Sequence, residues 1–323
     1  MHEIFGKIRN IGIIPVIKID DVEKAVPLAR ALDSGGIPCA EITFRTAAGE
    51  EAIRRVAREV PGVLLGAGTV LSIEQADRAI AAGARFIVSP GFNPKVVAHC
   101  AGKGMPIIPG CSNPSDIEQA LEFGLDAVKF FPAEQAGGLE YIKAISAPYS
   151  NIKFIPTGGI NAENISRYLA FEKVIACGGS WMAGADLINA GNFDKIAALS
   201  RGALLSVLGL HVAHIGVNAG SKKAAAQAAA LLKSLFPVSD NGDFLVVGDK
   251  IRIAKHKEPG KHGQIVIGSA GIYRAQAYLE RLSIEIDAES IEKDNKGNLH
   301  SFYLKEEILG FAVQVIQKAA VFA

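Results

Sequence analysis

Short apolar runs rich in β-branched residues recur through the first 182 residues, and their starts lie 20 to 26 residues apart. The segments between them repeat apolar positions with helical periodicity, as in DDVEKAVPLARALDSG and SIEQADRAIAAGA. Ser72 and Ser115 are expected to cap two of these helices. The apolar runs are IIPVI (13–17), CAEITF (39–44), LLGAGTV (64–70), FIVSPG (86–91), PIIPGC (106–111), AVKFFPA (127–133), KFIPTGG (153–159) and VIACGGSWM (174–182).

Eight strand–helix units at this spacing predict an α/β fold in which eight parallel strands close into a (β/α)₈ TIM barrel. An open doubly wound sheet is the alternative, but such a sheet usually has fewer strands. Because barrel enzymes place their catalytic groups at the C-terminal ends of the strands, polar residues within the apolar runs are the first candidates for chemistry.

The pattern changes near residue 205. The segments LHVAHIGVNAGSKKAAAQAAALLKSLF and KHGQIVIGSAGIYRAQAYLERL each predict a strand, a short turn and an amphipathic helix, which is a weak internal repeat. We therefore expect a barrel domain over 1–205 and a second, smaller α+β domain over 206–323. Its strand-like runs cover 210–217, 244–248, 251–255, 263–268 and 310–317, with helices near 221–236 and 271–282.

Composition narrows the classes of partner. The 34 basic and 33 acidic residues leave a formal charge of +1, so no overall field attracts nucleic acid or a membrane surface. No stretch reaches the roughly 18 apolar residues of a membrane helix, and the N-terminal MHEIFGKIRNIG lacks the apolar core of a signal peptide. The four cysteines form no C-x-x-C pair, which favours reduced core thiols. We expect a cytoplasmic protein that acts on a small molecule.

The second run, AEITFRT, carries charges within an apolar strand. With a period of two, Glu41, Thr43 and Arg45 share one face, while Ile42 and Phe44 take the other and pack on the helices. This pattern turns a carboxylate and a guanidinium into the mouth of the barrel. The alternative is a buried Glu–Arg pair whose members only satisfy each other.

The sixth run, AVKFFPAE, places Lys129 among apolar residues, and lysine is seldom buried without a reason. Apolar burial disfavours the charged ammonium and would leave a neutral amine that can attack a carbonyl. The alternative is a lysine whose amine reaches solvent at the end of the strand.

Two further features could bind a ligand. The third run ends GAGTV, where glycines allow close approach and Thr69 offers a hydroxyl. The seventh and eighth runs end in TGGI and CGGSW, whose exposed backbone N–H groups, followed by helix N-termini, suit a phosphate. His2 and His99 are the only histidines of the first 205 residues, so no metal site is evident there.

Taken together, these runs resemble the 2-keto-3-deoxy-6-phosphogluconate/4-hydroxy-2-oxoglutarate aldolase family of class I aldolases, which need no metal or other cofactor. The resemblance covers roughly residues 1–205 and rests on IIPVI, EITFRT, GAGTVL, SPG, PIIPG, KFFPAE, PTGGI and GGSW. It implies that Lys129 forms a Schiff base with pyruvate and that Glu41 shuttles protons. It also implies a homotrimer.

The resemblance further implies how a substrate is held. Arg45 and Thr69 would bind the pyruvate carboxylate. The other implied residues are Pro90, Phe131 and Thr157, which would line the pocket, and Gly158, Gly159, Gly179 and Ser180, which would bind a distal phosphate.

The C-terminal part resembles the vicinal-oxygen-chelate (glyoxalase-like) fold, which pairs two βαβββ units and usually holds a metal. His214, Gln264 and Gln314 lie at plausible ligand positions, but Arg252 stands where an acidic ligand would be expected. We therefore expect no metal there and an assembly or regulatory role. The remaining histidines of this part are scattered: His211, His256, His262 and His300.

Three hypotheses about the first 205 residues remain open at this stage. The leading one is a class I aldolase acting on a phosphorylated 2-keto-3-deoxy sugar acid, or on 4-hydroxy-2-oxoglutarate. A phosphate-binding isomerase would use the glycine loops without needing a buried lysine. A ligand-sensing barrel without catalysis would not need both Glu41 and Lys129.

Overall fold

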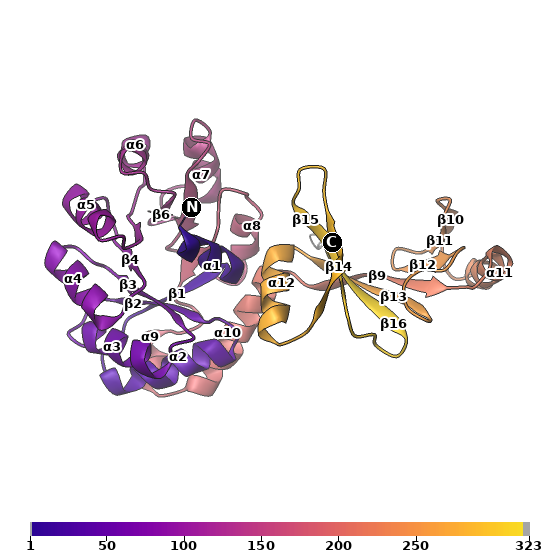
Figure 1. Ribbon diagram of the computed structural model, residues 1–323, viewed down its shortest axis with the longest axis horizontal. Coiled ribbons are helices and arrows are strands. Elements are labelled where there is room, and N and C mark those ends of the chain that lie inside the picture. The colour runs from indigo at the N-terminus through magenta and orange to yellow at the C-terminus, as the bar shows by residue number, and fades with distance from the viewer. Residues whose placement is uncertain (1, 319–323) are drawn as a thin grey trace. The chain divides into compact units, whose positions relative to one another are not determined.

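The computed structural model describes residues 2–318. The chain forms two compact units, Met1–Val207 and Leu208–Ala323. Strands and helices alternate along the first unit, whereas the second is built on one large sheet (Figure 1).

The first unit follows the predicted alternation of strand and helix. Helix α3 shows why: it buries Ala52, Ile53 and Val56 on one face and leaves its charged residues on the other. The strands are β1 (Ile13–Ile17), β2 (Cys39–Thr43), β3 (Leu64–Gly68), β4 (Phe86–Val88), β5 (Ile107–Ile108), β6 (Ala127–Phe130), β7 (Lys153–Pro156) and β8 (Cys177–Gly179). The helices are α1 (Glu3–Ile11), the 3₁₀ helix η1 (Val22–Lys24), α2 (Ala25–Ser34), α3 (Gly49–Glu59), α4 (Ile73–Ala82), α5 (Pro94–Gly102), α6 (Pro114–Glu122), α7 (Gly138–Ser146), α8 (Ile165–Leu169), α9 (Ala185–Asn189) and α10 (Phe193–Leu208).

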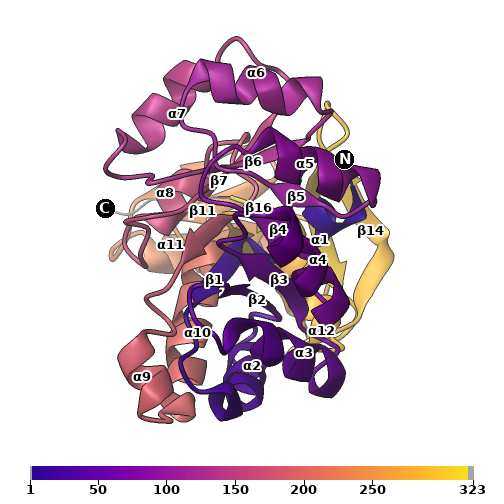
Figure 2. The ribbon, with the colours of Figure 1, turned by 90° about the vertical axis from the view of Figure 1, so that its left-hand side faces the viewer.

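Six of these strands form a curled parallel sheet in the order β5-β4-β3-β2-β1-β8, and β6 pairs with β7 in a second parallel sheet. Isolated parallel bridges join Gly110 to Lys129 and Thr157 to Gly178. Figure 2 shows helices α2 to α7 arranged around the strands. Strand β5 is only two residues long because Pro106 and Pro109, which flank it, have no N–H to donate to a ladder.

The ends of the helices test the predicted caps. Ser72 caps α4, as predicted, by accepting a hydrogen bond from the N–H of Gln75. The prediction for Ser115 is wrong, because Asn113 caps α6 and accepts from the N–H of Asp116 at 3.0 Å. Proline is favoured at the first position of a helix, where its missing N–H costs nothing, so Pro114 fixes the start two residues earlier than expected.

Two expectations from composition concern the whole chain. All four cysteines are free and buried, as expected of core thiols. Among the helices that the structure describes, none combines the length and the apolar character needed to cross a bilayer.

The second unit repeats one order of elements, a strand, a helix and three strands. The elements are β9 (His211–Asn218), α11 (Lys222–Leu232), β10 (Val238–Asp240), β11 (Phe244–Val247), β12 (Ile251–Ala254), β13 (Gly263–Ser269), α12 (Ile272–Arg281), β14 (Ile286–Lys293), β15 (Leu299–Leu304) and β16 (Phe311–Gln317). Its eight described strands form one mixed sheet in the order β10-β11-β12-β9-β13-β16-β15-β14.

Side chains alternate between the two sides of this sheet. Helix α11 buries Ala225 and Ala229 against Val247 and Ile253 of β11 and β12. Sequence reasoning found five of these strands and missed β10, β14 and β15. The first two are edge strands whose polar and charged residues hide the apolar pattern that marks a strand.

Candidate active site

Lys129 and Glu41 meet in the interior of the first unit although they lie 88 positions apart in the chain. Lys129 belongs to β6, where its neighbours Val128 and Phe130 are fully buried. Its Nζ lies 3.4 Å from Oε1 of Glu41 in β2. The two residues are 7% and 3% exposed, so Lys129 is buried and does not extend into solvent as the alternative interpretation requires. The arrangement is a buried amine next to a buried carboxylate.

The position of Glu41 depends on a glycine in the neighbouring strand. A Cβ atom added to Gly68 of β3 would lie 2.2 Å from Oε1 and 2.6 Å from Cγ of Glu41. The next residue, Thr69, has a φ of 57°, a left-handed conformation that residues other than glycine seldom adopt. Strained backbone of this kind is concentrated at functional sites, which makes Thr69 a candidate for ligand binding.

The alternation predicted for AEITFRT holds as far as Phe44, one residue beyond the end of β2. The ring of Phe44 packs 5.9 Å from the guanidinium of Arg78 in α4, which confirms that this side chain faces the helices. Thr43 is fully buried, and its hydroxyl donates to the carbonyl of Ile17 at 2.8 Å. Arg45 lies in an exposed turn two residues beyond the strand. A buried pair of Arg45 with Glu41 is therefore wrong, because Glu41 pairs with Lys129.

Three predicted lining residues lie just after strands. The ring of Phe131 follows β6, is 40% exposed, and has its centroid 5.6 Å from Nζ of Lys129. Thr157 follows β7 and is buried; a Cβ atom on Gly178 would lie 2.3 Å from its hydroxyl oxygen. Pro90 is half-buried two residues beyond β4. Of these three residues, Phe131 is thus the one whose ring faces the amine of Lys129.

The glycines predicted to bind a phosphate lie in the loop after β7 and at the end of strand β8. Gly158 and Gly159 have φ values of 100° and 78°. Gly179 packs closely against the ring of Trp181, since a Cβ atom added to Gly179 would lie only 1.9 Å from that ring. Ser180 is exposed. The expected helix N-termini do not follow directly: α8 and α9 are five residues each and begin several residues later. Any phosphate binding here rests on the loop N–H groups.

Sequence reasoning missed Glu134, the last residue of KFFPAE. Its carboxylate accepts a hydrogen bond from the hydroxyl of Tyr168 and lies 3.6 Å from the guanidinium of Arg167. Its N–H donates to the carbonyl of Gly158 at 3.1 Å. Burial and this hydrogen bond raise the pKa of Tyr168, so its hydroxyl remains a donor. Glu134 therefore joins the loop after Lys129 to the glycine loop through its N–H, and its carboxylate contacts Tyr168, 34 positions away, which the motif does not reveal.

Metal-binding side chains are dispersed over the part of the chain that the structure describes. Within residues 2–318, no three His, Cys, Asp or Glu side chains group so as to hold a metal ion. In the first unit, Nε2 of His99 lies 2.8 Å from Asp77. In the second, Nε2 of His256 lies 2.8 Å from Glu258, and His214 is buried.

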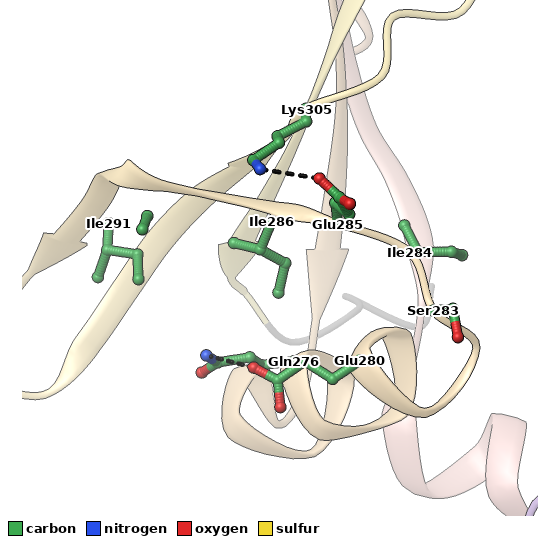
Figure 3. Close-up of a pocket in the computed structure, with 9 residues that line it drawn as sticks. Gln276, Glu280, Ser283, Ile284, Glu285, Ile286, Ile291 and Lys305 are labelled. Atoms are coloured by element: carbon green, nitrogen blue, oxygen red, sulfur yellow. Dashed lines mark hydrogen bonds and ion pairs between the residues drawn. The ribbon is translucent and has the colours of Figure 1, made fainter.

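A hollow of about 460 Å³ lies between α12 and β14 of the second unit (Figure 3). Its polar groups satisfy one another. Nζ of Lys305 lies 2.8 Å from the carboxylate of Glu285, and the amide of Gln276 donates to Glu280 at 3.0 Å. The remaining lining is largely aliphatic, so no side chain there is placed for catalysis.

Known proteins resemble the first unit in both sequence and structure. A sequence model described as "Aldolase: KDPG and KHG aldolase" matches residues 4–199. A 2-dehydro-3-deoxy-phosphogluconate aldolase of Treponema pallidum is 55% identical over 201 residues, which cover 62% of this chain and 96% of the relative. A protein of the same name from Haemophilus influenzae is 47% identical over 200 residues, which cover 62% of this chain and 94% of the relative.

Two solved structures are also similar to the first unit. The KDPG aldolase of Legionella pneumophila, with pyruvate captured as a covalent carbinolamine intermediate, is 38% identical with a TM-score of 0.60 and covers 62% of this chain and 97% of its own. The 2-keto-3-deoxy-6-phosphogluconate aldolase of Zymomonas mobilis with 3-phosphoglycerate is 37% identical with a TM-score of 0.57, covering 62% and 94%. With its matched segment and its buried lysine–glutamate pair, this chain belongs to the KDPG and KHG aldolase family.

Proposed function

We propose that this chain is a class I aldolase, a carbon–carbon lyase, that cleaves 2-keto-3-deoxy-6-phosphogluconate to pyruvate and glyceraldehyde 3-phosphate. The observation that carries the proposal is the buried contact of 3.4 Å between Nζ of Lys129 and Oε1 of Glu41. A nucleophile needs a base within reach, and proton transfer needs the same group close to the reacting carbon. Membership of the aldolase family supports the same reaction.

The chemistry begins at Lys129. Once it has given up a proton, its amine adds to the C2 carbonyl, and loss of water from the carbinolamine gives an iminium ion. Glu41 then takes the proton of the C4 hydroxyl as the C3–C4 bond breaks, and the electrons of that bond flow to the iminium nitrogen. The aldehyde leaves, and an enamine of pyruvate remains on Lys129. Glu41 delivers a proton to the enamine carbon, and addition of water releases pyruvate and restores the amine.

The remaining predicted residues hold the substrate in this proposal. Arg45 presents a planar guanidinium that can bind the carboxylate with two hydrogen bonds, and Thr69 adds a hydroxyl. Pro90, Phe131 and Thr157 line the reacting end of the substrate. The positive φ values of two loop glycines and the small residues at the end of β8 support binding of the distal phosphate: Gly158, Gly159, Gly179 and Ser180.

The choice of substrate is open to a direct comparison. The glycine loops favour the phosphorylated sugar acid, whereas 4-hydroxy-2-oxoglutarate, which would give pyruvate and glyoxylate, has no phosphate to bind. Turnover of the two substrates by the same preparation separates these possibilities. A phosphate-binding isomerase would not trap pyruvate, and a ligand-sensing barrel would show neither trapping nor turnover.

Borohydride trapping of pyruvate tests the central step. Reduction of the imine should attach one pyruvate-derived group to Lys129, detected by mass spectrometry of its peptide. Lys129→Ala should abolish trapping, whereas Lys153→Ala on the adjacent strand should not. Trapping that persists on another lysine in the Lys129→Ala variant contradicts the assignment. Glu41→Gln should still form some imine but slow turnover by about 10²- to 10⁴-fold, the usual contribution of acid–base catalysis.

Several features of the architecture belong to the proposal as well. We propose that the eight strands close into a TIM barrel, which the bridges Gly110–Lys129 and Thr157–Gly178 at the sheet edges support. The repeated order of strand, helix and three strands supports a vicinal-oxygen-chelate-like second domain with an assembly or regulatory role. A homotrimer and a cytoplasmic location stay predictions from the family resemblance and the sequence.

A further inference from the structure

Polar residues of three neighbouring strands surround Gly216 in the second unit. The ladders align Arg252 of β12 with Gly216 of β9, and Gly216 with Gln264 of β13. Residues paired in this way point to the same side of a sheet. His214 lies two positions before Gly216 on the same strand and shares this side. We call these four residues the Gly216 cluster.

The Gly216 cluster lies on the side of the sheet opposite to α11. Ile253 packs against that helix, and the adjacent Arg252 therefore points the other way. Even so, His214 and Gln264 are only 7% and 6% exposed. The sheet thus buries polar side chains on the side that α11 does not cover.

One ring nitrogen of His214 lacks a hydrogen-bond partner in the described part of the chain. Its Nδ1 is buried and has no hydrogen-bond partner among the residues that the structure describes. Burial and the positive charges of Arg252, Lys318 and Lys250 lower the pKa of His214 to about 4. The imidazole is therefore neutral near pH 7 and offers one N–H donor. A buried polar atom without a partner is uncommon and calls for a reason, such as a missing ligand.

Gln264 is held with its amide nitrogen near Gly216. The hydroxyl of Tyr303 donates to Oε1 of Gln264 at 2.6 Å. Burial, with Glu258 and Glu292 nearby, raises the pKa of Tyr303 to about 12, so the hydroxyl stays protonated. A Cβ atom on Gly216 would lie 2.8 Å from Cγ and 3.5 Å from Nε2 of Gln264. Glycine at this position leaves the space that the amide occupies.

The positive charge of Arg252 is not paired with a carboxylate in the described part of the chain. Its guanidinium lies 6.0 Å from the ring centroid of Phe244, and within residues 2–318 it pairs with no carboxylate. The nearby carboxylates have other partners, because Glu258 pairs with His256 and Glu292 accepts from Ser301. The Gly216 cluster therefore holds hydrogen-bond donors and one cation on the same side of the sheet.

We propose that the Gly216 cluster binds a small oxyanion, the carboxylate or phosphate group of a metabolite, through Arg252, Gln264 and His214. A planar guanidinium matches such a group with two parallel hydrogen bonds. Strands lie about 4.8 Å apart, so the backbones of Arg252 and Gln264 stand about 10 Å from each other, a separation across which two long side chains can hold one oxyanion. The site lies wholly in the second unit and does not depend on the aldolase reaction.

Hydrogen exchange on the full-length chain tests this site directly. Peptides covering β9, β12 and β13 are followed by mass spectrometry as inorganic phosphate or, separately, malonate is titrated at constant ionic strength. We expect saturable protection of these peptides, and the anion with the lower half-saturation concentration identifies the preferred group. Peptides of the first unit report separately on anion binding at the aldolase site. The absence of protection in β9, β12 and β13 would therefore contradict this proposal without contradicting the proposed aldolase.

Variants sharpen the result. Arg252→Gln should raise the half-saturation concentration at least about tenfold, the usual effect of losing a charged hydrogen bond. Gly216→Ala, which keeps every donor but displaces Gln264, should weaken binding similarly, whereas Lys257→Gln in an exposed loop should not. Absence of saturable protection by either anion overturns the proposal. The proposal is also overturned if Arg252→Gln binds the anion with unchanged affinity. It is overturned as well if Zn²⁺ protects these peptides and the anions do not.

Discussion

The two units bury polar groups in opposite ways. In the first, the amine of Lys129 lies 3.4 Å from the carboxylate of Glu41, so each charge has its counterpart inside the protein. In the second, His214 has a buried nitrogen without a partner in the described chain, and Arg252 has no acid. A buried charge is stable only when it is paired. The first arrangement can exchange protons internally, whereas the second has donors that the proposed anion would satisfy.

A glycine on a neighbouring strand sets the position of the polar group in both units. Gly68 leaves space for the carboxylate of Glu41, and Gly216 leaves space for the amide of Gln264. In both cases the missing side chain is part of the site, although glycine contributes no functional group. Replacing either glycine by alanine adds one methyl group, which should displace the polar side chain that the glycine now accommodates.

The largest effect is expected from Gly68→Ala. The new Cβ atom would lie 2.2 Å from Oε1 of Glu41, far inside van der Waals contact, so the carboxylate must move away from Lys129. A misplacement of about 1 Å can cost about 100-fold in rate. We expect kcat to fall by about that factor, measured with 2-keto-3-deoxy-6-phosphogluconate, while borohydride trapping of pyruvate continues.

Gly62→Ala is the matched control, because an added Cβ atom there meets nothing within 4 Å. Its kcat should equal that of the unmodified enzyme. A Gly68→Ala variant with normal kcat would show that Glu41 is not held by this contact, or that its position does not limit the rate.

The chemistry of the first unit could be predicted from sequence because its signals are local. An apolar run that contains a lysine or a glutamate marks a buried charge, and Lys129 and Glu41 were identified in this way. Arg45 was placed in a strand that ends earlier, because alternation says nothing of where a strand stops. Glu134 was missed because its partner, Tyr168, is distant in the chain and nothing in KFFPAE points to it.

The second unit was harder to predict for the same physical reason. Its cluster depends on register, which aligns Arg252, Gly216 and Gln264 across three strands. Sequence reasoning noted His214, Gln264 and Arg252 as positions but could not know that a glycine stands between them. Register follows from packing of the whole sheet, so it is not written in any one segment.

Acid should weaken the second unit through His214. Its pKa is about 4 in the folded chain, lowered by burial and then by Arg252, Lys318 and Lys250, against about 6.5 when unfolded. The unfolded state therefore binds more protons below pH 6.5, and stability falls as the pH falls. Between pH 7 and pH 5 we expect this histidine to remove about 2 kcal/mol from the free energy of unfolding.

Urea unfolding at pH 7 and pH 5, followed by pulsed hydrogen exchange of peptides from β9 and β13, measures this change. His214→Phe should remove most of the difference between the two pH values, since no imidazole is left to protonate. His300→Gln replaces an exposed histidine of the same unit and should leave the difference unchanged. An unaltered pH dependence in His214→Phe would contradict the assignment.

The smallest effects are expected from replacing two residues that have a left-handed backbone, and one of these tests whether Thr69 binds substrate. Thr69 has a φ of 57°, and Ser283 in the second unit has a φ of 58°, whereas no residue of the Gly216 cluster is strained in this way. Glycine adopts this conformation without steric cost, so Thr69→Gly and Ser283→Gly should each stabilise their unit by up to about 1 kcal/mol. If Thr69 also binds the substrate carboxylate, its variant alone should raise KM about tenfold, the effect of losing a hydrogen bond to a charged group. Thr69→Ser keeps the hydroxyl and should keep KM, so an unchanged KM in Thr69→Gly would leave Thr69 with strain but no part in binding.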